Sequence, residues 1–132
     1  MYISKKNREL IRQKYGGKCA YTGTELLADW QVDHVEPVRR NWWDNTACVE
    51  RNHNLDNMVP CQKIVNHYKH SQGLSMFRYF MMDFHNRLKK YPKNPQVAKS
   101  IKRKAYMMEI AELFGIAPDN PFTGKFYFEQ FN

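Results

Sequence analysis

The stretches VDHVEP at residues 32–37 and DNMVPCQKIVN at residues 56–66 decide how we interpret this chain. Alternation of polar and apolar residues over 30–35 predicts a short strand. A proline at the start of 60–70 favours a helix there, because proline is well suited to a first helical turn. The predicted strand carries an aspartate and a histidine, and the predicted helix carries an asparagine and a lysine. These side chains suit hydrolytic chemistry.

Phosphodiester hydrolysis needs a base for the attacking water and a cation for the charge that builds up on phosphate. His34 can accept a proton near neutral pH, since the ordinary pKa of histidine is about 6.5. Asp33 and Asn66 offer the oxygen ligands that suit Mg²⁺. Neighbouring strand residues point to opposite faces, so a local twist or bulge must bring Asp33 and His34 to one site. Lys69 shares the helix face of Asn66 and can reach toward a phosphate.

The composition narrows the class of protein. The 132 residues carry 21 Lys and Arg against 13 Asp and Glu, a net charge of +8. Such an excess of positive charge attracts polyanions. It indicates either a nucleic-acid-binding protein or a soluble protein whose surface is basic without a binding role. The mean hydropathy is −0.76, and no run of 18 apolar residues is present, which excludes a membrane span. We therefore expect no membrane partner.

Cysteine usage and the N-terminal residues bear on the compartment. Three cysteines without a CxxC pair argue against a disulfide framework and fit a reducing cytoplasm. The first 17 residues contain no apolar segment of the kind found in secretory signals. We expect a cytoplasmic protein with a single domain over residues 1–132.

Local patterns predict the remaining elements. They are a helix that Ser4 caps and Gly16-Gly17 ends, a short strand over 18–22, helices over 75–90 and about 96–114, and a strand or extended arm over 125–129. Residues 37–56 are predicted as a long loop, a length typical of functional loops.

Four strings carry a resemblance to a known family: YGGKCAYTG at 15–23, VDHVEPV at 32–38, DNMVP at 56–60 and NHYK at 66–69. They resemble the HNH endonuclease family over roughly residues 8–78. The family's signature positions fall on His34, Asn57 and Asn66, an H-N-N variant of phage and bacterial type. The resemblance implies an α+β fold in which a ββα-metal (His-Me) finger, about 18–70, is embedded in a small, mostly helical domain. A helical extension over about 74–132 follows.

The resemblance implies a divalent-metal-dependent endonuclease that hydrolyses phosphodiester bonds in double-stranded DNA, with Mg²⁺ or Mn²⁺ as cofactor. His34 would activate water, while Asp33 and Asn66 would hold the metal. Asn57 would orient the loop beside His34. Asn54 is a competing central asparagine, but the residue nine positions later is a lysine, which cannot bind a metal.

The chain departs from the family at the structural zinc that many members hold with two CxxC pairs. The four corresponding positions are Cys19, Thr22, Gln62 and Val65, and three of them lack a thiol. We therefore expect no structural zinc, with hydrophobic packing in its place. Cys19 then becomes a buried thiol.

Several charged residues are candidates for further roles. Basic candidates for DNA contact, besides Lys69, are Arg39 and Arg40 in the long loop and Lys102, Arg103 and Lys104 in the last long helix. The alternatives are a loop that its tryptophans anchor and a solvated helix face. Glu36 has two possible roles. It belongs to the site, as an additional metal ligand or as a partner of the ligands, or it is an exposed acid without a role there. For the histidines at 53, 67, 70 and 85, surface, capping or structural roles are favoured.

Two other functions remain open from the sequence. One is a non-catalytic nucleic-acid-binding module, and the other is a subunit that is active only with a protein partner in a phage or restriction assembly. The set of Asp33, His34 and Asn66 favours the enzyme, because a binding clamp needs none of them.

Overall fold

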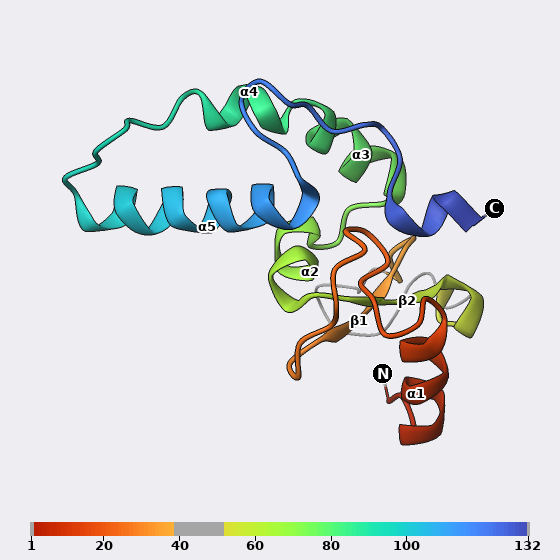
Figure 1. Ribbon diagram of the computed structural model, residues 1–132. Coiled ribbons are helices and arrows are strands. Elements are labelled where there is room, and N and C mark those ends of the chain that lie inside the picture. Colours follow the sequence, from red (N-terminus) through yellow and green to blue (C-terminus); the bar gives the residue numbers. More distant parts are fainter. Residues whose placement is uncertain (1, 39–51, 132) are drawn as a thin grey trace, which may run out of the picture. The chain divides into compact units, whose positions relative to one another are not determined.

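The computed structural model describes residues 2–38 and 52–131. Within these residues the protein is a small α+β structure with five α-helices and one two-stranded antiparallel sheet (Figure 1). The expected α+β class is therefore confirmed, while the ββα-metal finger stays a prediction. The described chain forms two compact units, 1–76 with 126–132 and 77–125. None of the helices in the described ranges is long and apolar enough to cross a membrane.

The first unit contains most of the elements. They are α1 (Lys5–Gln13), β1 (Gln31–His34), the 3-10 helix η2 (Leu55–Asn57), β2 (Met58–Cys61), α2 (Lys63–Lys69), the beginning of α3 (Leu74–Met82) and the 3-10 helix η3 (Tyr127–Phe131).

Helix α1 begins where the sequence predicts it. The hydroxyl of Ser4 accepts a hydrogen bond from the backbone N–H of Asn7 at 3.1 Å, which caps the helix. Ile11 is buried and packs with Trp30 and Met58 in one core cluster. Burial of each such side chain stabilises the fold by about 1.5–3 kcal/mol, so this cluster fixes α1 against the sheet.

Strands β1 and β2 pair antiparallel, with Gln31 opposite Cys61 and His34 opposite Met58 (Figure 1). Proline 60 therefore lies in a strand, and the predicted helix start at this residue is wrong: α2 begins at Lys63. Proline lacks an N–H, which suits an edge strand as well as a first helical turn. Pairing with β1 decides between the two.

The expected strand over 18–22 is also absent from the described structure. Lys18 forms only an isolated bridge with Glu25, and the residues between them make a tight turn. In this turn Cys19 donates its N–H to the carbonyl of Thr24 at 2.8 Å, and Gly23 donates to the carbonyl of Cys19 at 2.9 Å. We call residues 18–25 the knuckle.

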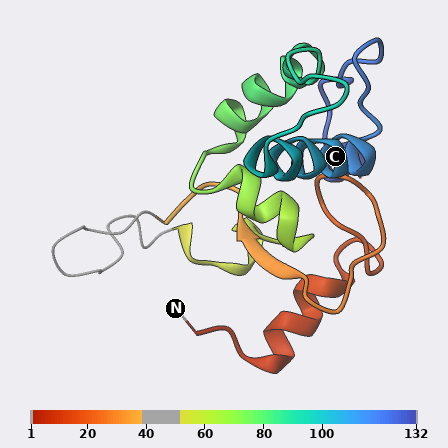
Figure 2. The ribbon, with the colours of Figure 1, turned by 90° about the vertical axis from the view of Figure 1, so that its left-hand side faces the viewer.

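The second unit is helical. It comprises the rest of α3, α4 (Phe84–Leu88) and α5 (Ala98–Phe114), and α4 lies beside α5 in both views (Figures 1 and 2). The predicted helix over 75–90 is interrupted at Asp83. Gly115 ends α5 in the left-handed conformation with φ 71°, as predicted. Buried apolar side chains of the three helices form this unit's core: Phe77, Met81, Phe84, Leu88, Met107, Ile110 and Ala111.

The C-terminal residues return to the first unit and pack on the knuckle. Tyr127 and Phe128 donate backbone hydrogen bonds to the carbonyls of Tyr21 and Ala20, at 3.2 and 2.8 Å. The Phe126 ring, fully buried, packs edge-on against Tyr21 with centroids 5.2 Å apart. The segment forms the 3-10 helix η3 rather than a strand, although Tyr127 and Phe128 pair with the knuckle.

Candidate active site

His34 is the last residue of β1, and its side chain meets a second histidine. Nε2 of His34 lies 3.0 Å from Nδ1 of His53, and the ring centroids are 5.3 Å apart. From the sequence, a role of His53 in the site was only a minor alternative, as a metal ligand, and contact with His34 was not predicted. Strand register could have found it, because Met58 is paired with His34 and His53 lies only five residues before Met58.

Asp33 lies in different surroundings. Its carboxylate is only 5% exposed and accepts a hydrogen bond from the hydroxyl of Tyr21. The ammonium of Lys69 lies 3.1 Å from Oδ2 and 3.5 Å from Oδ1 of the same carboxylate. The register of β1 is regular through Asp33 and His34, so the expected bulge is absent and the two side chains point to opposite faces of the strand.

Lys69 is fully buried, which does not fit the expectation that it reaches toward a phosphate. Besides Asp33, its ammonium donates to the carbonyl of His34 at 3.0 Å. A buried ammonium is retained only when it is paired and hydrogen-bonded. Lys69 therefore joins the end of α2 to Asp33 and His34 of β1 through buried contacts.

Burial governs the titration of this cluster. Desolvation raises the pKa of the Asp33 carboxyl, although Lys69 and the hydrogen bond from Tyr21 act in the opposite direction. Burial, together with the nearby Asp33 carboxylate, raises the pKa of Tyr21 well above its ordinary value. The Tyr21 hydroxyl therefore remains a hydrogen-bond donor to Asp33 through the neutral range.

Asn66 lies on α2 and faces the same side of β1 as Asp33. Its Nδ2 donates to Oε1 of Gln31 at 2.7 Å, and Gln31 is two residues before Asp33 on the strand. Residues two apart on a strand share a face. The bond through Nδ2 orients the amide, so Oδ1 of Asn66 is the end that can act as a ligand.

Asn57 makes hydrogen bonds to backbone groups on both sides of the site. Its Nδ2 donates to the carbonyls of Glu36 and Asn52, each at 2.7 Å, and its Oδ1 accepts from the N–H of Glu36 at 2.9 Å. Val35 also donates its N–H to the carbonyl of Asn57. These bonds join the end of β1 to the turn before β2, the arrangement that a positioning residue produces.

Glu36 is exposed, and its carboxylate is used at the start of α3. Oε1 accepts the N–H of Leu74 at 3.2 Å, and a side chain at Gly73 would meet Oε2 at 2.7 Å. This carboxylate thus lies at the N-terminus of α3, where a negative charge is favourable. This contact gives Glu36 a structural use that the sequence did not suggest.

The other basic candidates are distributed as follows. Arg39 and Arg40 lie outside the described residues. Lys102 and Arg103 are exposed on α5. Lys104 instead donates to the carbonyls of Pro92 and Lys93, at 2.7 and 2.8 Å, and so fastens the connection that precedes α5.

Gln62 occupies one of the four positions to which the HNH resemblance assigns a zinc ligand, and it is buried in a hydrogen-bond network. Its Nε2 donates to Oγ1 of Thr24 and to the carbonyl of Glu25, and its Oε1 accepts the N–H of Leu27 at 3.3 Å. Its own N–H points to Sγ of Cys19 at 3.5 Å. One amide thus joins the knuckle to the start of α2.

Cys19 and Val65 are both fully buried, as the expected packing requires. Burial acts to raise the pKa of Cys19, but hydrogen bonds from Cys61, Thr22 and Gln62 lower it overall, to about 6. The expectation that the knuckle holds no zinc stays a prediction. The hydrogen bonds of Gln62 join the knuckle to the start of α2, the two segments that a zinc ion would join.

Comparisons of this chain with protein-family models, with curated proteins and with solved structures found no match.

No group of three or more His, Cys, Asp or Glu side chains converges on a common point within residues 2–38 and 52–131. The site predicted from sequence contains one carboxylate and one amide and is not a cluster of that kind. Its function therefore depends on the geometry of His34, Asp33 and Asn66.

Proposed function

We propose that this protein is a divalent-metal-dependent endonuclease of the HNH type, which hydrolyses phosphodiester bonds in DNA. One observation carries the proposal: two antiparallel strands and a helix follow one another along the chain as β1, β2 and α2. His34 ends β1, Asn57 ends η2 directly before β2, and Asn66 lies on α2. This order of elements supports the ββα finger that the HNH resemblance implies. The net charge of +8 supports a polyanionic substrate.

His34 is the proposed general base. A neutral imidazole has one nitrogen that carries hydrogen and one that accepts a proton. When Nε2 of His34 donates to Nδ1 of His53, Nδ1 of His34 is the nitrogen that accepts the proton of the attacking water. His53 then stabilises the imidazolium that forms, because its lone pair faces the N–H.

The regular register of β1 leaves Asp33 and His34 on opposite faces of the strand, so the proposed metal ligands, Asp33 and Asn66, are considered separately from the base. Their oxygens are of the kind that a hydrated divalent cation takes. Asn66 offers Oδ1, since its Nδ2 is held by Gln31. Asp33 has a carboxylate whose Oδ1 makes only the longer contact with Lys69, and a carboxylate has about four acceptor sites. Mg²⁺ usually keeps several waters and needs few protein ligands. The cation, when bound, would neutralise charge that develops on the phosphate.

Asn57 and Lys69 are proposed to hold this geometry. Asn57 fixes the backbone directly after His34, and Lys69 fixes the carbonyl of His34 together with the carboxylate of Asp33. Preorganised side chains reduce the reorganisation that the reaction requires. Both residues act through their neighbours and need no contact with DNA.

Cleavage of supercoiled plasmid tests the proposal. We expect nicked or linear DNA with Mg²⁺ or Mn²⁺, none with EDTA, and a loss of at least about 100-fold in the His34→Ala variant, which is the usual contribution of a general base. His67→Ala, which removes an exposed histidine on α2, is the matched control and should keep wild-type activity. Cutting by His34→Ala at the wild-type rate would overturn the assignment.

The buried ion pair favours a second candidate, a nucleic-acid-binding module without catalysis. Lys69 and Tyr21 already engage the Asp33 carboxylate, which could have a purely structural role. This candidate predicts DNA binding that is equal in EDTA and in Mg²⁺, with no cleavage under any divalent ion.

A further inference from the structure

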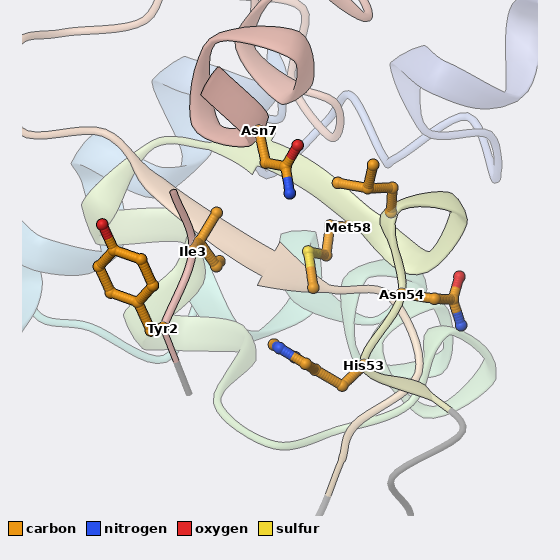
Figure 3. A pocket seen from close by; sticks show the side chains of 7 residues that line it. Tyr2, Ile3, Asn7, His53, Asn54 and Met58 are labelled. Carbon is orange, nitrogen blue, oxygen red and sulfur yellow. The ribbon is translucent and has the colours of Figure 1, made fainter. Parts of the chain in front are cut away.

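A pocket of about 220 Å³ opens in the first unit beside the candidate base (Figure 3). The N-terminal segment contributes Tyr2 and Ile3, and α1 contributes Asn7. The turn before β2 contributes His53. Asn54, Leu55 and Met58 complete the lining. Figure 3 shows the side chains of Ile3, Met58 and His53 directed toward the same space.

The lining favours a flat, neutral ring over a charged group. None of the seven side chains is Lys, Arg, Asp or Glu, so the pocket has no counter-charge for a phosphate and no carboxylate for a cation. Ile3, Leu55 and Met58 supply apolar surface, and the Asn7 amide supplies both a donor and an acceptor. For comparison, a dry cavity of about 150 Å³ holds one benzene molecule. The space is therefore sufficient for a single heteroaromatic ring.

Tyr2 adds a stacking surface at the pocket. Its side chain is 86% exposed although it is a large aromatic. Exposed aromatic rings beside nucleic-acid sites stack on unpaired bases and do so with little sequence preference. An exposed ring next to a pocket with an amide at its edge is the combination that holds a base by stacking and by one or two hydrogen bonds.

His53 connects this pocket to the candidate base. Its ring lines the pocket, and its Nδ1 lies 3.0 Å from Nε2 of His34. A ring bound in the pocket therefore lies one imidazole away from the histidine that would face the scissile phosphate. In a nucleotide, a base is joined to its own phosphate through a single sugar, so both can be engaged at once.

We propose that the pocket binds one unstacked nucleobase of the substrate strand, next to the phosphate that is cut. This inference rests on the proposed function and adds a preference to it. Taking a base out of a duplex is least costly where it is mismatched, bulged or single-stranded. The enzyme should therefore prefer such positions over uniform duplex.

Photochemical cross-linking tests the pocket without requiring a known recognition sequence. Wild-type protein in EDTA is irradiated with a single-stranded oligonucleotide in which every thymine is replaced by 5-iodouracil. We expect cross-linked peptides that contain Tyr2, His53 or Met58. Cross-links that map only to other peptides, such as those of α5, would overturn the proposal.

A pair of tyrosine variants supplies the matched binding test. Tyr2→Ala should raise the dissociation constant for the same oligonucleotide about tenfold, and should leave affinity for an abasic oligonucleotide unchanged. Tyr79→Ala removes another exposed tyrosine, 70% exposed on α3, and should change neither. Equal effects of the two variants would contradict the base pocket.

The two proposals can fail separately. Plasmid cleavage that depends on His34, without cross-links at the pocket, would leave the nuclease and remove the base site. Cross-links at Tyr2 or His53 without cleavage under any divalent ion would leave a base-binding pocket on a protein that is not a nuclease.

Discussion

The imidazole of His34 needs a fixed tautomer to act as a base, because only a ring nitrogen without hydrogen accepts a proton. The 3.0 Å contact between Nε2 of His34 and Nδ1 of His53 supplies such a constraint when Nε2 carries the hydrogen. In many catalytic sites a carboxylate or a carbonyl holds the ring in this way. Here a second imidazole does so, and it also lines the base pocket.

We expect His53→Ala to lower kcat about tenfold, since the variant loses the acceptor for Nε2–H of His34, and to raise KM, since His53 also lines the base pocket. His53→Asn, whose carbonyl oxygen can replace Nδ1 as acceptor, should recover part of the rate. The ¹⁵N chemical shifts of His34 report its tautomer independently of activity. If they are the same in wild type and His53→Ala, the positioning role is wrong.

The buried group of Tyr21, Asp33 and Lys69 makes stability depend on alkaline pH. The pKa of Tyr21 is raised well above its ordinary value of 10.0 in the folded protein. Above pH 10 the unfolded chain therefore loses this proton first, and the native state binds more protons than the unfolded state. The free energy of unfolding consequently falls as pH rises, by at most about 1.4 kcal/mol per pH unit for one group.

Tyr21→Phe tests this dependence. At pH 7 the variant should be less stable than wild type by about 1.5–3 kcal/mol, the usual contribution of a hydrogen bond to a charged group. Above pH 10 the difference should shrink, because only the wild type loses stability through this phenol. Urea unfolding between pH 7 and 11 measures both, with Tyr2→Phe as the exposed control. A difference that is constant over this range contradicts the assignment.

At the scale of elements, local signals predicted what local interactions determine. Ser4 caps α1 and Gly115 ends α5 because these functions depend only on nearby backbone. β2 was missed because Pro60 suits either a helix start or an edge strand, and the choice comes from pairing with Val32 of β1, 28 residues earlier. Long-range pairing was the information that local patterns lacked.

In the candidate site, too, positions within one element were predicted and contacts between distant segments were not. The sequence placed Asn66 and Lys69 on one helix face, and the structure has both on α2, facing β1. It did not indicate that Lys69 would be buried on Asp33, or that Glu36 would bind the N-terminus of α3. Both contacts join segments that are more than 30 residues apart, so spacing within one element could not reveal them.

The knuckle depends on one amide. Gln62→Ala should destabilise the protein by about 1–3 kcal/mol, because the variant loses three part-buried hydrogen bonds, to the hydroxyl of Thr24, the carbonyl of Glu25 and the N–H of Leu27. Gln13→Ala on α1, which loses a single exposed bond to Glu9, is the control and should change stability by less than about 0.5 kcal/mol. Equal midpoints in urea for wild type and Gln62→Ala would show that the network does not hold the knuckle.

At the scale of the whole molecule, the positive charge predicts a salt-dependent affinity for DNA. Neutralisation of each phosphate contributes about −0.9 to the slope of log affinity against log salt on duplex DNA. Lys102 and Arg103 are exposed on α5, whereas Lys104 is engaged with backbone carbonyls and is a weaker candidate.

Replacing Lys102 and Arg103 together by alanine should reduce the magnitude of this slope by about 1.8, if each contacts one phosphate. Lys89→Ala with Lys90→Ala removes the same charge from exposed positions that follow α4, and should leave the slope close to that of wild type. Binding titrations across a range of salt concentrations measure both. Identical slopes for the two double variants would assign the effect to net charge and not to a contact by α5.

The return of residues 126–128 to the knuckle has a consequence for biosynthesis. The carbonyls of Ala20 and Tyr21 and the ring of Tyr21 obtain these partners only from residues translated more than 100 positions later. Tyr21 in turn binds Asp33 next to the candidate base. A ribosome that stops within α5 therefore releases a chain whose site lacks its closing segment. The surroundings of Tyr21 are therefore complete only after residues 126–128 have been translated.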